Sequence, residues 1–121
     1  LESVGVVEIE AASGSYDYEA KYRRDDTRYT VDPALPAGAG EAIAARSVEI
    51  ARRLGVRHLA RVDYLLDAEG VAWFLEINTM PGFTGHSLLP MAAGARGLGM
   101  SALCAGLVER ALSERAGARS V

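Results

Sequence analysis

Residues Arg61 to Ser87 read RVDYLLDAEGVAWFLEINTMPGFTGHS, and this stretch decides the fold. In the segments before and after the run Asp67-Ala68-Glu69-Gly70, successive side chains fall alternately into two sets, one for each face of an extended chain. Alternation with a period of two is typical of a half-buried strand, and the run between the two segments consists of turn-forming residues. The stretch therefore predicts two antiparallel strands joined by a tight turn, followed by a glycine-rich loop.

Strand geometry sorts the side chains of this predicted hairpin into two faces, because a turn of even length keeps the alternation in step. One face is polar and holds Arg61, Asp63, Glu76 and Asn78. The other face is predicted to be core and holds Val62, Tyr64, Leu66, Val71, Trp73, Leu75 and Ile77.

The polar face has the chemistry of a cation and phosphate site. Carboxylate and amide oxygens are ligands for hard cations, and Mg²⁺ is commonly held by one or two carboxylates together with substrate phosphates. Arg61 adds a fixed positive charge that suits a phosphate or an oxyanion. The alternative is a solvated face on which Arg61 and Asp63 form only a surface ion pair.

The loop from Thr79 to Ser87 ends where a helix is expected to begin. Ser87 is a good N-cap, and Pro90 is tolerated in the first turn. A helix N-terminus offers backbone N–H groups and the positive end of a dipole to an anion. The sequence thus places an anion site close to the cation site, although Pro81-Gly82 and Gly85-His86-Ser87 also suit an ordinary turn and cap.

These segments resemble a known family. RVD at residues 61–63, EINTMPG at 76–82 and TGHS at 84–87 are similar to the C-terminal signature of D-alanine–D-alanine ligases, members of the ATP-grasp superfamily. The segment YDYEAKY, residues 16–22, resembles the lid of that family. The resemblance covers nearly the whole chain and implies an α+β fold, the ATP-grasp C-terminal subdomain, with a mainly antiparallel sheet and flanking helices.

The resemblance also implies how the chain is organised. Residues 1–121 would form the C-terminal part of an ATP-grasp domain, with a lid loop at about 11–31, a metal- and phosphate-binding hairpin and loop at 59–87, and C-terminal helices at 87–116. Val4 to Glu10 is expected to be a strand that begins abruptly. We therefore expect an incomplete piece that lacks the N-terminal and adenine-binding parts and does not turn over alone.

By resemblance, the parent enzyme ligates two D-alanines to D-alanyl-D-alanine for peptidoglycan precursors. ATP phosphorylates the first carboxylate, and the second amine attacks the acylphosphate. The implied roles are one Mg²⁺ or Mn²⁺ on Asp63 and Glu76, a second on Glu76 and Asn78, oxyanion stabilisation by Arg61 and the Gly82 N–H, second-substrate binding by Ser87 and the Leu88 N–H, and ATP binding and closure by Lys21 and Tyr22.

Two other functions stay open. Another ATP-grasp ligase, such as a D-alanine–D-lactate ligase or a different carboxylate–amine ligase, would share the metal face. A truncated module would keep the fold without turnover. Tyr22 and the Thr84 to Ser87 segment favour the dipeptide ligase, whose implied partners are ATP, D-alanine and, in the full-length enzyme, a second copy.

Composition argues against several classes of protein. The net charge of −3 gives no basic footprint for nucleic acid. No apolar run approaches the roughly 20 residues that span a bilayer, so no membrane partner is expected. His58 and His86 are too few for a zinc site, and Cys104, in an apolar helical pattern, is expected to be a buried structural thiol. These features suit the cytoplasm.

Helical periodicity appears in two further segments. Residues 40–54 predict a helix with a stripe formed by Ile43, Ser47, Ile50, Ala51 and Leu54. A last helix is predicted from Ser101, with an apolar stripe formed by Leu103, Leu107, Val108 and Leu112.

Overall fold

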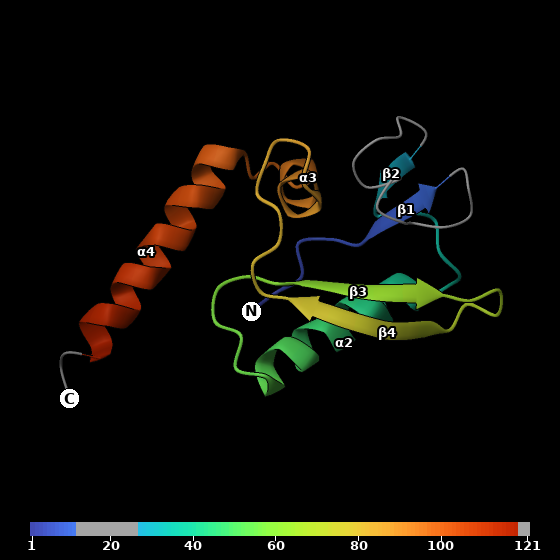
Figure 1. The fold of residues 1–121 in the computed structure, drawn as a ribbon, viewed down its shortest axis with the longest axis horizontal. Helices are drawn as coiled ribbons and strands as arrows, with labels where there is room; N and C mark the ends of the chain where they lie inside the picture. The colour runs from blue at the N-terminus through green and yellow to red at the C-terminus, as the bar shows by residue number, and fades with distance from the viewer. Residues whose placement is uncertain (12–26, 119–121) are drawn as a thin grey trace.

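The computed structural model describes residues 1–11 and 27–118 (Figure 1). Within these ranges the chain forms two antiparallel two-stranded sheets and three helices. In chain order the elements are β1 (Val7–Ala11), β2 (Thr27–Val31), α2 (Ala39–Arg53), β3 (Arg61–Leu66), β4 (Ala72–Asn78), α3 (Leu88–Ala95) and α4 (Met100–Ala118). The predicted combination of antiparallel sheet and flanking helices is confirmed.

The first sheet pairs β1 with β2, from Val7 opposite Val31 to Ala11 opposite Thr27. The strand β2 corrects the prediction of a loop over about 11–31, in which Thr27–Val31 was not expected to be a strand. Its sequence, TRYTV, is rich in β-branched and aromatic residues, which favour a strand once a partner is alongside. The rest of the predicted lid, with Lys21 and Tyr22, lies outside the described residues.

The hairpin β3–β4 contains a bulge that the sequence did not predict. Near its open end Asp63 lies opposite Glu76, but the register then shifts, so that Tyr64 lies opposite Phe74. Leu75 is thus the extra residue of a β-bulge. Because the shift reverses the alternation, Trp73 lies opposite Leu65 and joins the face of Asp63, not the predicted face of Tyr64.

The turn of this hairpin spans residues 67–71, one residue more than predicted. The Gly70 N–H donates to the Asp67 carbonyl at 3.0 Å, and Gly70 has a φ of 81°, which favours glycine. The longer turn and the bulge each shift the register by one residue, and the two shifts offset each other. The predicted shared face of the four polar residues therefore survives at the open end.

Helix α2 packs beside the hairpin (Figure 1). Ser47 Oγ contacts Tyr64 Oη at 3.1 Å, and the Tyr64 ring meets Phe74 edge to face at 6.1 Å between centroids. Of the predicted helical stripe, Ala51 is buried, but Leu54 is 63% exposed. Leu54 leaves the stripe because the helix ends at Arg53 and Leu54 is its C-cap.

Large apolar side chains are poorly covered in the described part of the chain. The buried apolar residues there are Ala51, Ala92 and Ala93. Val71, Trp73 and Leu75, all predicted to be core, are 48%, 58% and 60% exposed. This correction follows from the turn and the bulge, which turn these residues away from the face covered by α2.

Helices α3 and α4 meet at 106° around a connection that includes Gly97 (φ 80°). Helix α4 leans away from the rest of the molecule (Figure 1), and Cys104 on it is exposed rather than buried as predicted. Among the described helices, none alone is long and apolar enough to cross a bilayer, although α3 and α4 taken together as a bent pair reach that length and composition.

Candidate functional site

The polar face of the β3–β4 hairpin brings Arg61, Asp63 and Glu76 together. Arg61 grips Asp63 with two bonds, Nε to Oδ1 at 2.7 Å and Nη2 to Oδ2 at 2.9 Å. The same Nη2 lies 3.8 Å from Glu76 Oε1. The side chains of Arg61 and Asp63 are 26% and 30% exposed, whereas that of Glu76 is 61% exposed. The guanidinium thus pairs with two carboxylates, one on its own strand and one on the adjacent strand, and its single charge offsets only one of them.

Asn78 completes this face opposite Arg61. Its side-chain oxygen accepts the Met80 N–H at 2.9 Å, which fixes the amide at the start of the loop. An amide oxygen has two lone pairs, so Asn78 Oδ1 can take one further partner.

The donor set on this face fits a hard cation that also binds phosphate. The described residues contain no group of three or more His, Cys, Asp or Glu side chains that could hold a metal without other ligands. Two carboxylates and an amide oxygen are the partial set that Mg²⁺ takes when substrate phosphates supply the rest. Arg61 already pairs with Asp63, so the alternative prediction of a surface ion pair describes the same contact in the absence of ligand.

The loop after β4 folds back on itself through Ser87. Ser87 Oγ accepts the Thr84 N–H at 2.9 Å and lies 2.9 Å from Thr84 Oγ1. The Gly82 backbone packs against the same hydroxyl, since a Cβ on Gly82 would lie 2.9 Å from Ser87 Oγ. The two predicted anion-binding positions, Gly82 and Ser87, are therefore neighbours in space.

Ser87 is the N-cap of α3, as predicted, but its side chain makes no capping bond to the helix. Its carbonyl accepts the Met91 N–H at 3.0 Å, and Pro90 has no N–H to satisfy. The first-turn donors of α3 are therefore the N–H groups of Leu88 and Leu89. This end of the helix offers hydrogen bonds and positive potential to an anion.

Sequence reasoning assigned Trp73 to the apolar face, whereas the register places it opposite Leu65, on the face of Asp63. The Trp73 indole Nε1 donates to Asp67 Oδ2 at 2.7 Å. This bond, followed by the bond from the Val71 N–H, lowers the pKa of Asp67 below its ordinary value. An aspartate that begins a turn and precedes a tryptophan by six residues is the signal that could have indicated this arrangement.

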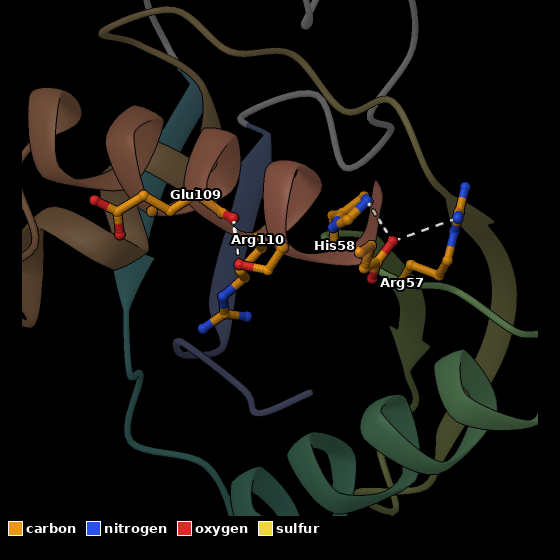
Figure 2. A pocket seen from close by; sticks show the side chains of 7 residues that line it. Arg57, His58, Glu109 and Arg110 are labelled. Carbon is orange, nitrogen blue, oxygen red and sulfur yellow. Dashed lines mark hydrogen bonds and ion pairs between the residues drawn. The ribbon is translucent and has the colours of Figure 1, made fainter. Parts of the chain in front are cut away.

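A hollow of about 550 Å³ lies elsewhere, between α4 and the loop before β3, and is lined by Arg57, His58, Gly106, Glu109, Arg110, Ser113 and Glu114. Arg57 and His58 approach the same carboxylate of Glu114, at 3.4 and 3.5 Å (Figure 2). None of the predicted site residues lines this hollow. Across this gap Arg57 and His58 pair with Glu114, and these contacts join α4 to the loop.

Comparison with known proteins places these features in context. Residues 1–109 match the family model described as the D-ala D-ala ligase C-terminus. The D-alanine–D-alanine ligase of Aromatoleum aromaticum is 48% identical over 106 residues, covering 88% of this chain and 34% of the relative. That of Bordetella pertussis is 47% identical over 115 residues, covering 94% of this chain and 36% of the relative. The chain thus spans about a third of the length of these curated relatives.

Solved structures give the same result. The D-alanine–D-alanine ligase of Bacillus anthracis complexed with ATP aligns with a TM-score of 0.74 and 34% identity, over 93% of this chain and 37% of that one. The VanG D-Ala:D-Ser ligase of Enterococcus faecalis aligns with a TM-score of 0.67 and 33% identity, over 86% of this chain and 30% of that one. The fold is therefore that of ligases with different second substrates.

Proposed function

Because this chain belongs to the family of D-alanine–D-alanine ligase C-terminal domains, we propose that its enzyme uses ATP to join two D-alanines for peptidoglycan precursors. The observation that carries the proposal is the register of the β3–β4 hairpin, in which Asp63 lies opposite Glu76 and Arg61 opposite Asn78. Four side chains suited to cations and phosphate thereby share one surface.

Asp63, Glu76 and Asn78 are the residues that would hold Mg²⁺ or Mn²⁺, with Asp63 and Glu76 at one ion and Glu76 and Asn78 at a second. Such ions neutralise the phosphate oxygens of a nucleotide during phosphoryl transfer. Among the ion-paired side chains of Arg61, Asp63 and Glu76, that of Glu76 is the most exposed, which leaves its oxygens open to a ligand. Asp63 would exchange part of its bond to Arg61 for that ligand.

Arg61 then has a second role in the proposed reaction. Attack of the second D-alanine's amine on the activated carbonyl forms the new C–N bond and moves the carbonyl electrons onto oxygen. The Arg61 guanidinium and the Gly82 N–H would stabilise that oxyanion before phosphate leaves. Half-burial of the guanidinium supports this role, because a partly desolvated charge acts more strongly than a solvated one.

Ser87 and the Leu88 N–H would bind the carboxylate of the second D-alanine. The positive end of α3 supports this assignment, as does the packing of Ser87 Oγ against Gly82, which puts the two anion sites side by side. Lys21 and Tyr22, outside the described residues, remain proposals from the family resemblance, with Lys21 on the transferring phosphate of ATP. A cytoplasmic location and a homodimeric parent enzyme remain proposals of the same kind.

A chimera tests the proposal. This chain is joined to the N-terminal two thirds of one of the D-alanine–D-alanine ligases compared above, and ADP release is measured with D-alanine. We expect activity in the chimera and a loss of at least about 100-fold in Glu76→Gln and Asp63→Asn, because metal-borne stabilisation of the transition state amounts to several kcal/mol. Glu69→Gln, in the exposed turn, is the matched control and should retain activity.

The same assay separates the alternatives. Preferential ADP release with D-serine or D-lactate as second substrate would favour a ligase of different specificity, such as the D-Ala:D-Ser relative. A folded chimera that releases no ADP, beside an active parent ligase, would favour a module without turnover.

A further inference from the structure

Thr84 holds the Ser87 side chain on the loop side of α3. The Thr84 N–H donates to Ser87 Oγ at 2.9 Å, Thr84 Oγ1 lies 2.9 Å from the same oxygen, and the Thr84 carbonyl accepts the Ser87 N–H at 3.0 Å. An N-cap serine ordinarily accepts an N–H of the first helical turn instead. Ser87 makes no such capping bond to α3. Thr84 therefore keeps the Ser87 hydroxyl away from the first-turn N–H groups.

The contacts of Thr84 also decide what the Ser87 hydroxyl can bind. Thr84 Oγ1 accepts the His86 N–H at 3.3 Å, and the hydrogen bond between the two hydroxyls can run in either direction. When the Thr84 hydroxyl donates, Ser87 Oγ accepts two hydrogen bonds, and both of its lone pairs are in use. The Ser87 O–H is then free to donate, but its oxygen has no lone pair left for another donor.

A ligand at the start of α3 then meets a set of donors. Pro90 lacks an N–H, so the backbone donors of this turn are those of Leu88 and Leu89, and the Ser87 O–H adds a third. A carboxylate suits such a set, because both of its oxygens only accept. A carboxamide does not, because its NH₂ group would face a donor with no acceptor to bind.

We propose that Thr84 is a positioning residue that sets the specificity for the second substrate. It occupies the acceptor sites of Ser87 Oγ and so makes Ser87 a donor, which restricts the site to amino acids with a free carboxylate. The inference rests on the proposed function, which places that carboxylate at Ser87 and Leu88. Thr84 acts through Ser87 and does not itself bind the substrate.

The direction of the Ser87 side chain is measured on the chain alone. Thr84→Val removes the hydroxyl contact to Ser87 Oγ, so that this oxygen is freer to accept the Leu89 N–H, a usual partner of an N-cap serine. We expect solvent exchange of the Leu89 amide, followed by NMR, to slow at least about twofold. Thr84→Ser keeps the hydroxyl and should exchange as the unsubstituted chain does.

The specificity is measured in the chimera described above. D-Alanine and D-alaninamide are supplied together at equal concentration, and the dipeptide and the dipeptide amide are quantified by mass spectrometry. D-Alaninamide has no carboxylate to activate and can serve only as the second substrate, so the product ratio reports the preference for a carboxylate there. We expect Thr84→Val to lower this ratio about fivefold, the scale of one net hydrogen bond, and Thr84→Ser to restore it.

Two controls separate this role from general damage to the loop. Thr79→Val makes the same change at an exposed threonine of the same loop and should leave the product ratio unchanged. The KM for ATP should also stay unchanged in Thr84→Val, since the proposed nucleotide site does not include Ser87.

Three results would overturn the role of Thr84 while the proposed function stands. The first is an unchanged product ratio in Thr84→Val, and the second is an equal fall in Thr84→Val and Thr84→Ser. The third is unchanged exchange of the Leu89 amide in Thr84→Val. An inactive unsubstituted chimera beside an active parent ligase would instead count against the proposed function, and the specificity assigned to Thr84 would fall with it.

Discussion

Gly82 shows how tightly the loop before α3 is constrained. In Gly82→Ala the new Cβ would lie 2.9 Å from Ser87 Oγ, which is itself bonded to Thr84. We expect Ser87 to rotate and lose those bonds, at a stability cost of about 1 kcal/mol. Thermal unfolding measures this cost, and the KM for the second D-alanine in the chimera should rise.

Gly85→Ala is the matched control for this substitution. A Cβ there meets no atom within 4 Å, and Gly85 needs no positive φ. A loss of stability in Gly85→Ala equal to that in Gly82→Ala would show that any added side chain destabilises the loop, and that the contact with Ser87 Oγ is not the cause.

Asp32 is the one non-glycine residue with positive φ (48°) in the described ranges. Its N–H donates to the Val6 carbonyl at 2.7 Å, its Oδ1 accepts the Val6 N–H at 3.2 Å, and its carboxylate pairs with Arg96 at 3.3 Å. It therefore ties the first sheet to the end of α3.

Asp32→Ala should cost about 1–2 kcal/mol, because alanine tolerates this backbone conformation less well and loses the bond to Val6. Urea unfolding measures the loss. Asp32→Asn should retain most of the stability, since asparagine accepts the same bond and the exposed pair with Arg96 contributes at most about 1 kcal/mol. Equal losses in the two variants would assign the effect to the ion pair instead.

For single residues, the sequence predicted which side chains lie close together, but not which hydrogen bonds they form. Alternation along two strands predicted Arg61, Asp63, Glu76 and Asn78 on one face, and this prediction held because the longer turn and the bulge offset each other. Side-chain torsion angles decide the two hydrogen bonds between Arg61 and Asp63 and the bond between Ser87 and Thr84. Those torsion angles depend on residues that are near in space, and a linear sequence pattern does not identify these neighbours.

Among the elements, the β3–β4 hairpin best separates what was predictable from what was not. Alternation predicts the strands and their polar face. It does not reveal a bulge whose register shift is offset by a longer turn. Trp73 was therefore assigned to the wrong face, and its outward position became visible only in the register. The strand β2 was missed because five residues form a strand only with a partner, which the sequence did not identify.

The hairpin turn should respond to pH through Asp67. Its folded-state pKa is lowered, by the Trp73 indole first, so the ionised form stabilises the turn. That contribution is present above the unfolded pKa of about 4 and is lost as the pH falls through the folded value. Thermal unfolding of the chain and of Asp67→Asn should therefore differ at neutral pH and converge in acid. A gap that stayed constant to low pH would exclude the carboxylate charge as its cause.

For the molecule as a whole, α4 is attached at separated points. Its first turn follows the α3 connection, and further along Glu114 receives Arg57 and His58 from the loop before β3. Val108 and Leu112, both predicted to lie on an apolar stripe, are 59% and 60% exposed. The position of α4 thus depends on polar contacts more than on apolar packing.

Glu114→Gln should loosen α4 without affecting the hairpin. Amide hydrogen exchange in the second half of α4 should become faster by up to about fivefold, because exposed ion pairs contribute at most about 1 kcal/mol. Exchange in β3 and β4 should stay unchanged. Glu109→Gln, on the same helix, is the control, and an equal effect there would point to general charge loss.

The family could be identified from short motifs, because those motifs carry the chemistry. How the large apolar side chains are covered could not, since burial is a property of what lies alongside in three dimensions. The exposure of Trp73, Leu75 and Cys104 therefore had to come from the structure.

One consequence follows from the way Ser87 faces its loop. Because the Ser87 hydroxyl bonds to Thr84, the first turn of α3 has no side-chain cap. Pro90 has no N–H, so the N–H donors left in that turn are those of Leu88 and Leu89. The carboxylate of an arriving amino acid would supply that missing cap, so the substrate would complete a secondary-structure element. Binding of the amino acid would then stabilise the first turn of α3, so that this helix would be most stable in the substrate-bound enzyme.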